Sequence, residues 1–445
     1  MTATGTLLIT NGAVVTADPA IGDLTRADIL VRDGVIAEIG PDLRAEADDT
    51  IDATDMIAIP GLVDGHRHMW EGLLRNCLPD GDIDDYFAVV NGELAPAYTA
   101  EDAYLGELLT AYGAVDAGVT TVLDWSHIQT GPAHTDAVIQ ALREVGLRTV
   151  FAFGPPGDQQ ADHRWPQDVK RLRNEVFTRD DDLITLGLAT FSPEHQPYDV
   201  AKEHFQLARD VDALITVHAG LNGLGEPGQI ERFGREGLLG PDVNLIHCNT
   251  LSSEEWRIIA DTGTSVSITP STEMQMGQGI PPLRQALRAG VLPSVGVDVE
   301  VSAATDLWTQ LRILFSLERS QVLEDRYKGL NPEPPMTSAQ LLQCATSAGA
   351  AACRLADRIG TLAAGRQADI VLLRTDQINT MPVNDLTSVV VHNTDPRNVD
   401  TVIVAGRVRK RDGSLVGVDL ADLRGRVREA RSRVFTAAGR ASAGL

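Results

Sequence analysis

The sequence is poor in cysteine and contains no long apolar run. Its 445 residues include four cysteines, and no two of them form a C-x-x-C pair. Neither a disulfide framework nor a zinc-ribbon site is indicated, so we expect a reducing, cytoplasmic location. Because the sequence has no run of about 18 apolar residues and no basic leader followed by an apolar stretch, we expect no membrane partner.

An excess of positive charge is also absent, because 38 basic residues against 62 acidic ones give a formal net charge of −24. Such a surface repels phosphate backbones, so we expect no nucleic-acid partner. What the sequence does have is a 43% hydrophobic composition over 445 residues. This is enough for one large domain and a smaller one.

From about residue 57 onward, apolar runs of strand length alternate with amphipathic segments of helical length. Eight strands are predicted, over residues 57–64, 119–124, 148–153, 184–190, 213–218, 243–247, 264–269 and 293–298. This alternation predicts an α/β fold whose parallel sheet closes into a (β/α)8 TIM barrel. The doubly wound open sheet is the competing architecture, but no G-x-G-x-x-G follows a predicted strand.

The two ends of the chain are rich in short strand signals instead. Hairpin turns are predicted at Asn11-Gly12 and Asp33-Gly34, and strands return over residues 368–373, 388–391 and 399–404. We infer one small β-sandwich from residues 1–56 and 365–417, a barrel domain over 57–364, and an Arg-rich helix and tail over 418–445. We expect that helix to pack on the body rather than to form a partner surface.

Histidine and aspartate residues stand where four of the predicted barrel strands end. The first strand leads into His66 and His68, whose i, i+2 spacing on a strand points both side chains the same way. The fifth and sixth strands end at His218 and His247, and the eighth ends at Asp298. Since active residues of such barrels lie at the C-terminal strand ends, we expect these five side chains to meet. Imidazoles and a carboxylate suit one divalent metal, zinc in first place and iron as the alternative, which lowers the pKa of a bound water to about 7.

The ordered set of motifs resembles the amidohydrolase superfamily, and most of all its cytosine deaminase and triazine hydrolase branch. The resemblance rests on the segment 60–68, the strand-end residues, and Gly365-Arg366-Gln367-Ala368-Asp369-Ile370-Val371 in the tail. It implies His66, His68, His218 and Asp298 as ligands of a single metal, with His247 as a hydrogen-bonding catalytic residue. Asp298 is expected to act also as the base. The implied reaction is hydrolysis of a C–N bond other than a peptide bond, by deamination of a small nitrogen heterocycle, in a homodimer or homotetramer.

One position departs from this resemblance. Deaminases of this branch usually carry a glutamate three residues after the strand-five histidine, where Leu221 stands here. Leucine cannot carry a proton to the leaving ammonia. The candidate replacements are carboxylates near predicted strand ends, with Glu226 preferred because it shares a loop with His218: Glu194, Glu226, Glu273 and Glu300. Two alternatives stay open, a hydrolase whose leaving group needs no proton (dehalogenation or ring opening) and a non-catalytic metal-binding relative.

Four further residues are candidates for substrate contacts. Trp70 could stack on a planar ring, and Glu71 could accept hydrogen bonds from ring N–H groups. His127 follows the second strand and is expected to be a hydrogen-bonded rim residue, and Glu273 follows the seventh. The competing interpretation is packing for Trp70, a solvated carboxylate for Glu71 and Glu273, and a fifth metal ligand for His127.

Overall fold

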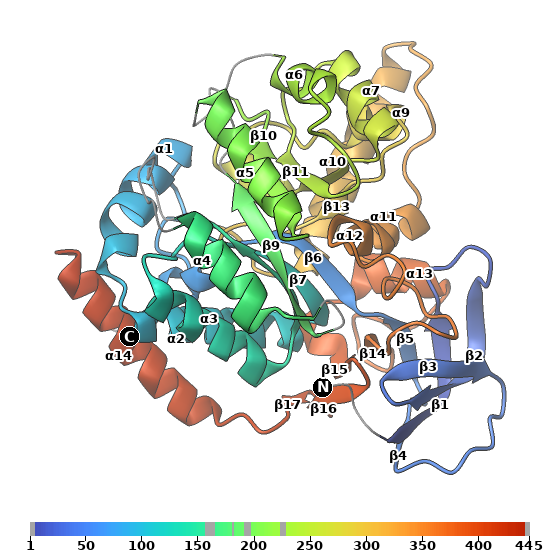
Figure 1. The fold of residues 1–445 in the computed structure, drawn as a ribbon. Coiled ribbons are helices and arrows are strands. Elements are labelled where there is room, and N and C mark those ends of the chain that lie inside the picture. Colours follow the sequence, from blue (N-terminus) through green and yellow to red (C-terminus); the bar gives the residue numbers. More distant parts are fainter. Residues whose placement is uncertain (1–4, 156–164, 180–181, 191–196, 223–227, 441–445) are drawn as a thin grey trace.

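A parallel barrel forms the centre of the computed structural model, which describes residues 5–155, 165–179, 182–190, 197–222 and 228–440 (Figure 1). Its eight strands are neighbours in chain order: β6 (Leu62–Arg67), β7 (Val119–Ser126), β8 (Arg148–Phe153), β9 (Ile184–Thr190), β10 (Leu214–Ala219), β11 (Val243–His247), β12 (Ser265–Ile268) and β13 (Ser294–Val295). The segment after β13 closes the ring against β6. There the Asp298 amide donates to the His66 carbonyl at 2.9 Å, and the His68 amide donates to the Asp298 carbonyl at 2.8 Å. The predicted barrel is confirmed.

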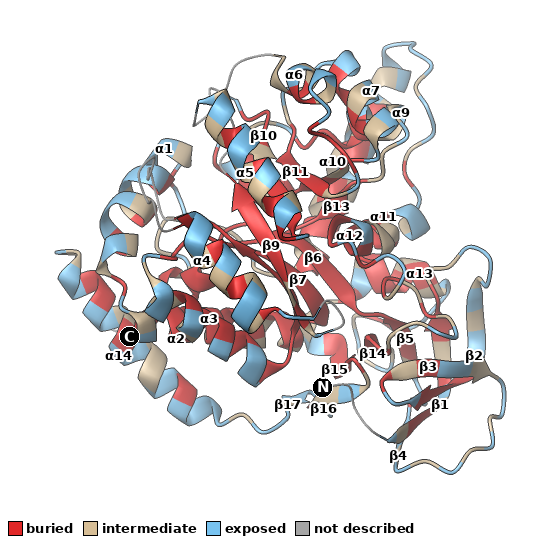
Figure 2. Cartoon of the chain, viewed as in Figure 1, coloured by how far each residue is buried: buried red, intermediate tan, exposed pale blue. Residues whose placement is uncertain are grey.

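Helices cover the outside of this barrel, and their inner faces and the strands are buried while their outer faces are exposed (Figure 2). The helices of the described barrel region are α1 (Ile83–Asp85), α2 (Ala100–Asp116), α3 (Pro132–Val145), α4 (Trp165–Arg171), α5 (Tyr198–Asp210), α6 (Gln229–Arg235), α7 (Ser253–Thr262), α8 (Pro270–Gln275), α9 (Leu283–Arg288), α10 (Leu307–Tyr327), α11 (Ser338–Cys344) and α12 (Ser347–Ala352). Local sequence sets their ends. A capping box between Ser252 and Glu255 starts α7, and Gly146, in the left-handed region at φ 67°, ends α3.

Both ends of the chain join in one mixed nine-stranded sheet beside the barrel (Figure 1). Its strands are β1 (Thr6–Val15), β2 (Asp23–Arg32), β3 (Val35–Gly40), β4 (Asp49–Asp52), β5 (Met56–Pro60), β14 (Ile370–Arg374), β15 (Val399–Val404), β16 (Arg407–Arg411) and β17 (Ser414–Leu415). The junction is the pairing of β5 with both β1 and β14. The predicted association of the two chain ends is confirmed, and the Asp33-Gly34 turn joins β2 to β3 as predicted.

The strand predicted over residues 57–64 is two strands. β5 belongs to the mixed sheet and β6 to the barrel, and the chain changes sheets at Gly61. The Gly61 amide donates to the Asp369 carbonyl in one layer, whereas the next amide, of Leu62, donates to Gly118 in the other. A side chain at Gly61 would overlap Thr120, because a Cβ built there lies 2.0 Å from the Thr120 hydroxyl oxygen. The apolar run over residues 57–64 is continuous, so the sequence pattern does not reveal that its two halves pair in different sheets.

Two further predictions for the chain ends were wrong. Asn11 is not a hairpin turn but a bulge inside the continuous strand β1, where its φ of 65° shifts the register against β2. Residues 388–391 are not a strand either. They form the helical turns α13 (Leu386–Ser388) and η5 (Val389–Asn393), because the Asp385 side chain caps the Ser388 amide at 2.7 Å. A helix cap therefore outweighs the strand propensity of the three valines.

The C-terminal helix α14 (Leu420–Ala437) packs on the body, as predicted (Figure 1). Its residues Leu423, Ala430 and Val434 are buried, and Arg433 pairs with Asp102 of α2 at 2.7 Å. Among the helices of the described ranges, none combines the length and apolar character needed to cross a bilayer.

Candidate metal centre

Two ligand-type side chains come from the end of β6. His66 is fully buried, and His68 is 4% exposed. Arg67, between them, takes the opposite direction and pairs with Glu300 through its Nε at 2.8 Å and with Asp64 at 3.3 Å. The alternation expected of a strand therefore separates the two imidazoles, which face the barrel mouth, from a buried ion-pair network behind them.

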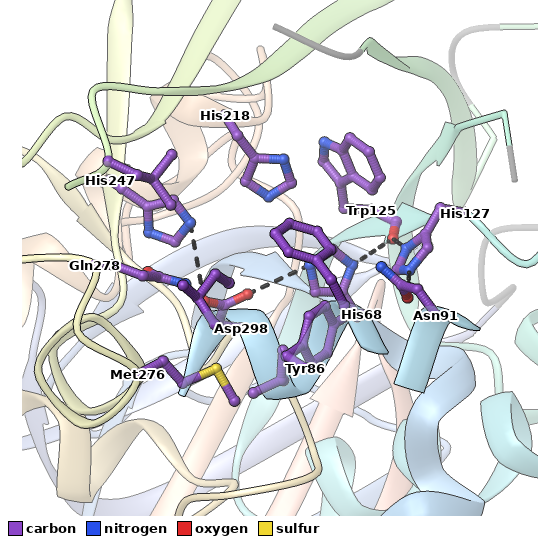
Figure 3. A pocket seen from close by; sticks show the side chains of 14 residues that line it. His68, Tyr86, Asn91, Trp125, His127, His218, His247, Met276, Gln278 and Asp298 are labelled. Carbon is purple, nitrogen blue, oxygen red and sulfur yellow. Dashed lines mark hydrogen bonds and ion pairs between the residues drawn. The ribbon is translucent and has the colours of Figure 1, made fainter. Parts of the chain in front are cut away.

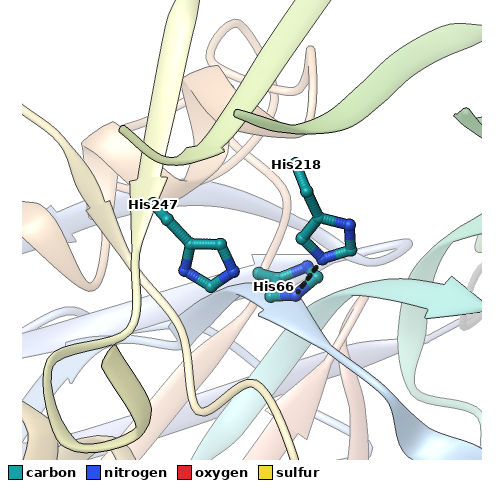
Figure 4. A group of neighbouring side chains, drawn as sticks. All are labelled: His66, His218 and His247. Atoms are coloured by element: carbon teal, nitrogen blue, oxygen red, sulfur yellow. Dashed lines mark hydrogen bonds between the residues drawn. The ribbon is translucent and has the colours of Figure 1, made fainter. Parts of the chain in front are cut away.

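Three more side chains converge on the same point from other strands. His218 lies on β10, His247 ends β11, and Asp298 follows β13 (Figure 3). The Nε2 atom of His66 lies 3.3 Å from Nε2 of His218 (Figure 4). The same atom lies 3.1 Å from Oδ1 of Asp298. Oδ1 of Asp298 also lies 3.3 Å from Nε2 of His68. The predicted meeting of these side chains at one centre is observed.

These spacings suit a shared cation. Ligand atoms about 2.0–2.1 Å from a tetrahedral zinc ion lie about 3.3 Å from one another, which matches the measured separations of 3.3, 3.1 and 3.3 Å. Two ring nitrogens that are not bridged by a proton or a cation have no reason to approach so closely in a buried site. Within the described part of the chain, the residues that could hold a metal ion fall in two overlapping groups, His66 with His218 and His247, and His66 with His68 and Asp298.

The backbone at two of these residues is held in an uncommon conformation. His247 has a φ of 75°, its neighbour Cys248 has a φ of 58°, and Asp298 has a φ of 74°. Non-glycine residues rarely adopt the left-handed region, at a cost of about 1 kcal/mol or more each. Two of the strained residues, His247 at the end of β11 and Asp298 after β13, have side chains that reach the centre. The backbone hydrogen bonds of Asp298 with His66 and His68 hold the strained conformation of Asp298 in place.

Hydrogen bonds on the far side of the ring fix the direction of two of the four imidazoles, those of His68 and His247. His68 donates from Nδ1 to the Trp125 carbonyl at 2.9 Å, which leaves Nε2 facing Asp298. His247 donates from Nδ1 toward Oε1 of Glu273 at 3.2 Å, and the same oxygen accepts the Thr269 amide at 2.7 Å. Partners of this kind orient metal-site imidazoles and select their tautomers.

Burial and mutual contact shift the pKa values of the group. Burial lowers the pKa of His66 to about 4, and burial together with the neighbouring imidazoles holds the pKa of His218 well below its usual range. Burial acts to raise the pKa of Asp298, but the imidazoles of His66 and His68 outweigh it and hold that pKa well below its usual range. Burial acts to lower the pKa of His68, but its hydrogen bond to Asp298 and the charge of Glu71 outweigh burial and raise that pKa. Neutral rings at His66 and His218 beside an ionised Asp298 are the protonation states that a divalent metal requires.

A pocket opens above these side chains (Figure 3). Aromatic and aliphatic groups dominate its described lining, which also contains neutral polar side chains: Ile83, Tyr86, Phe87, Asn91, Trp125, His127, Leu221, Met276, Gln278 and Val299. Asp298 is the one carboxylate among the lining residues within the described ranges. Leu221 is 5% exposed and occupies the position where the resemblance leads one to expect a glutamate.

Two of the four candidate acids, Glu273 and Glu300, are engaged elsewhere and do not belong to this lining. Glu300 is paired with both Arg67 and Arg75, and Glu273 is turned to His247. Glu194 and Glu226 lie outside the described residues, so their predicted catalytic roles stay predictions.

The predicted substrate contacts have different surroundings. His127 lines the pocket. Trp70 is fully buried behind it and donates from Nε1 to Nδ1 of His127 at 3.4 Å. Glu71, also fully buried, accepts from the Tyr86 hydroxyl at 2.6 Å and from the Glu300 amide at 3.0 Å. Trp70 and Glu71 therefore support pocket-wall residues. No sequence motif points to Tyr86, Asn91 or Gln278, since the first two lie in the helical turns of η2 (Tyr86–Leu94) and the third in the loop between α8 and α9.

Comparisons with known proteins agree with this geometry. The model of the amidohydrolase family matches residues 57–409. The 5-methylthioadenosine/S-adenosylhomocysteine deaminase of Desulforudis audaxviator is 30% identical over 435 residues, which cover 93% of this chain and 95% of that protein. The 5'-deoxyadenosine deaminase of Methanothermobacter thermautotrophicus is 29% identical over 426 residues, 92% and 94% of the two chains.

Solved structures show the same fold. An adenosine deaminase from Xanthomonas campestris with bound zinc superposes with a TM-score of 0.85 at 24% identity, over 97% of this chain and 98% of that one. The atrazine chlorohydrolase of Arthrobacter aurescens, complexed with zinc, gives a TM-score of 0.85 at 22% identity, over 96% of this chain and 100% of that one. With a family model that spans most of the sequence and a His/Asp metal site at the barrel mouth, this chain belongs to the amidohydrolase family and is a metal-dependent hydrolase.

Proposed function

We propose that this protein is a zinc-dependent aminohydrolase that removes the amino group of a purine nucleoside such as 5-methylthioadenosine or 5'-deoxyadenosine. The observation that carries the proposal is the convergence of three imidazoles and Asp298 beside His247, at the floor of a pocket with an aromatic lining. Relatives that match more than nine-tenths of the chain are deaminases of such nucleosides. A planar purine suits an aromatic pocket.

The proposed metal ligands are His66, His68, His218 and Asp298. Three neutral imidazole nitrogens and a carboxylate oxygen form a set that zinc accepts, and iron is the alternative. When bound, the metal supplies a Lewis acid that acidifies a coordinated water to a pKa of about 7.

The two carboxylate oxygens of Asp298 suit two tasks. Oδ1 faces the Nε2 atoms of His66 and His68 at 3.1 and 3.3 Å. Oδ2 accepts from the Thr269 hydroxyl at 3.2 Å and lies 3.9 Å from Nε2 of His247. We propose that Oδ2 receives the proton of the attacking water and that His247, oriented by Glu273, stabilises the charge that develops on the substrate.

Few acidic side chains are placed to protonate the leaving group. Because Asp298 is the one carboxylate in the described pocket lining, we propose that it passes the proton on to the departing ammonia, with Glu226 as the candidate outside the described residues. Leu221 also favours a second candidate function, hydrolysis that expels a group needing no proton, such as chloride.

A substrate panel tests the proposal. Purified protein loaded with one equivalent of zinc is incubated with adenosine, 5-methylthioadenosine, 5'-deoxyadenosine, S-adenosylhomocysteine and a chlorinated aminotriazine, and ammonia and chloride are measured. We expect ammonia from at least one nucleoside, and none from His66→Ala protein. Chloride release without ammonia would support the second candidate, and neither product would contradict both. Gel filtration with light scattering tests the predicted homo-oligomer.

A further inference from the structure

Three side chains that the proposed chemistry does not use form a chain of hydrogen bonds along one wall of the pocket. Trp70 lies in η1 (Met69–Leu74), His127 follows β7, and Asn91 lies in η2 (Tyr86–Leu94). Nε1 of Trp70 is 3.4 Å from Nδ1 of His127, and Nε2 of His127 is 3.3 Å from Oδ1 of Asn91. His127 and Asn91 line the pocket, and Figure 3 shows them together at the side away from His247.

The direction of this chain is fixed at its buried end. An indole N–H can only donate, so Nδ1 of His127 must act as the acceptor. Trp70 is fully buried, which leaves its N–H no access to bulk water. The Trp125 carbonyl, the alternative partner of the same Nδ1, lies 3.5 Å away, at the limit for a hydrogen bond, and accepts from Nδ1 of His68 at the shorter distance of 2.9 Å. A hydrogen on Nδ1 of His127 would point at the indole hydrogen of Trp70 and repel it.

The orientation of the Asn91 amide follows from that tautomer. With Nδ1 as acceptor, the ring hydrogen of His127 is on Nε2, and it is donated to Oδ1 of Asn91. The amide oxygen is thereby occupied. The Nδ2 amino group is left without a partner among the described residues, on a side chain that lines the pocket. The wall therefore presents N–H donors to whatever enters.

A second neutral amide stands at the other side of the pocket. Gln278 is 4% exposed and lines the pocket, and its Oε1 is buried without a hydrogen-bond partner among the described residues. Figure 3 shows Gln278 on the His247 side and Asn91 on the His127 side, with Asp298 and His68 between them. A buried polar atom of this kind is satisfied when a ligand supplies the missing partner.

We infer that Asn91 is a specificity-determining residue, held by Trp70 and His127 so that its amino group donates a hydrogen bond to an unprotonated ring nitrogen or carbonyl oxygen of the substrate. Trp70 and His127 are positioning residues in this account. Gln278 meets the substrate from the opposite side. The inference rests on the proposed function for the identity of the ring. A purine nucleoside carries acceptor nitrogens at three ring positions, and Asn91 recognises one of these acceptors.

Binding of ring analogues without the amino leaving group tests the inference separately from the release of ammonia. The probes are purine riboside, which lacks the amino group, and its 1-deaza, 3-deaza and 7-deaza analogues, each of which replaces one acceptor nitrogen with C–H. Calorimetric titration of the zinc-loaded protein gives Kd for each probe. We expect one deaza analogue to bind about tenfold more weakly than purine riboside and the other two to bind nearly as well as the parent.

The variants locate that loss on Asn91. Asn91→Ala should weaken purine riboside about tenfold and leave the sensitive deaza analogue unchanged, so that the difference between the two probes disappears. Asn91→Asp, which offers no donor, should behave likewise, and Trp70→Phe should reduce the difference while retaining the aromatic packing. Glu93→Gln, an exposed change in the same segment, is the control and should match the wild type, and thermal unfolding and zinc content confirm that each variant is folded.

Two results would overturn the inference: equal affinity of the wild type for all the deaza analogues, or the same fold-loss in Asn91→Ala for the parent and for every analogue. Absence of binding by purine riboside itself would overturn it as well. Failure of the proposed function has a different signature, because ammonia is then missing from the substrate panel while the binding pattern across the analogues is preserved.

Discussion

At the residue scale, the centre depends on buried hydrogen bonds that orient its imidazoles. Glu273 holds Nδ1 of His247 at 3.2 Å and is itself held by the Thr269 amide at 2.7 Å. We expect Glu273→Gln to lower kcat by about 10- to 100-fold with a smaller change in KM, because the neutral amide fixes the ring less firmly. Steady-state kinetics on the nucleoside with the highest turnover measure this effect. The exposed change Glu254→Gln serves as the control. An unchanged kcat in Glu273→Gln would contradict the role of Glu273 in orienting His247.

Leu221 offers a gain-of-function test at the same scale. Its side chain lines the same pocket as His218 and Asp298. A carboxylic acid there could protonate the leaving ammonia directly, so we expect Leu221→Glu to raise kcat for deamination at least tenfold, within the usual contribution of a general acid. Leu221→Gln has similar size without an ionisable proton and should bring no gain. A rate unchanged by Leu221→Glu would show that leaving-group protonation does not limit the wild type.

The ligand set could be predicted from sequence because strand register decides it. His66 and His68 are two residues apart on one strand, and the other three side chains follow apolar runs that end at the same rim. The surroundings of Trp70, Glu71 and Glu273 could not be predicted in this way. Each lies in a helical turn after a strand, where the direction of a side chain depends on contacts from distant segments.

At the element scale, α2 and β7 meet through two buried carboxyl groups. Glu107 of α2 and Asp124 of β7 are both fully buried. Burial raises the pKa of Asp124 to about 7, and burial together with the facing Asp124 carboxylate raises the pKa of Glu107 well above its usual range. Raised carboxyl pKa values mean that the folded state binds more protons than the unfolded state between about pH 4 and pH 7. Their contribution to the free energy of unfolding is therefore present at low pH and is lost as the pH rises through about 7.

The variant Glu107→Gln tests this contact, because glutamine has the shape of the protonated acid. We expect its free energy of unfolding to exceed that of the wild type at pH 8.5 and the difference to shrink toward pH 5.5, as measured by urea unfolding at both values. Glu203→Gln, which changes an exposed carboxylate of α5, should track the wild type at both pH values. A difference that is independent of pH would mean that Glu107 is ionised in the folded protein.

The elements that sequence predicted best are those with one strong local signal. The barrel strands are apolar runs, and the Asp33-Gly34 turn has the residues that its positive φ values favour. The wrong predictions concern residues with two compatible structures. Asn11 accepts a positive φ equally in a turn or in a bulge, and only its pairing with the distant β2 selects the bulge.

At the scale of the whole molecule, a bound metal would tie β6, β10 and the segment after β13 together. Any ligand that binds only the folded state stabilises it by about 4 kcal/mol when present at a thousand times its Kd. For a chain of 445 residues we expect removal of the metal by a chelator to lower Tm by about 4 °C, and restoration of one equivalent of zinc to reverse the change. Differential scanning fluorimetry of untreated, stripped and reloaded protein measures this, and identical Tm values would contradict a metal that bridges the barrel.

Acid should release the metal. The pKa of His66 is lowered to about 4 in the folded protein from its ordinary value near 6.5. The sign follows from linkage: stability that depends on a neutral His66 is complete above about pH 6.5 and is lost as the pH falls toward 4. Metal affinity falls over the same range because protons compete for the ring nitrogens. Metal retained after dialysis at pH 4 as fully as at pH 7.5 would contradict this coupling.

The central claim is that four side chains from three segments of the barrel share one cation. The most direct measurement is a crystal structure of the zinc-loaded protein with anomalous data collected at the zinc absorption edge. The account predicts one anomalous peak per chain, within about 2.0–2.2 Å of Nε2 of His66, His68 and His218 and of an Asp298 carboxylate oxygen. A peak at another place, or fully occupied zinc in a His66→Ala, His218→Ala double variant, would contradict it.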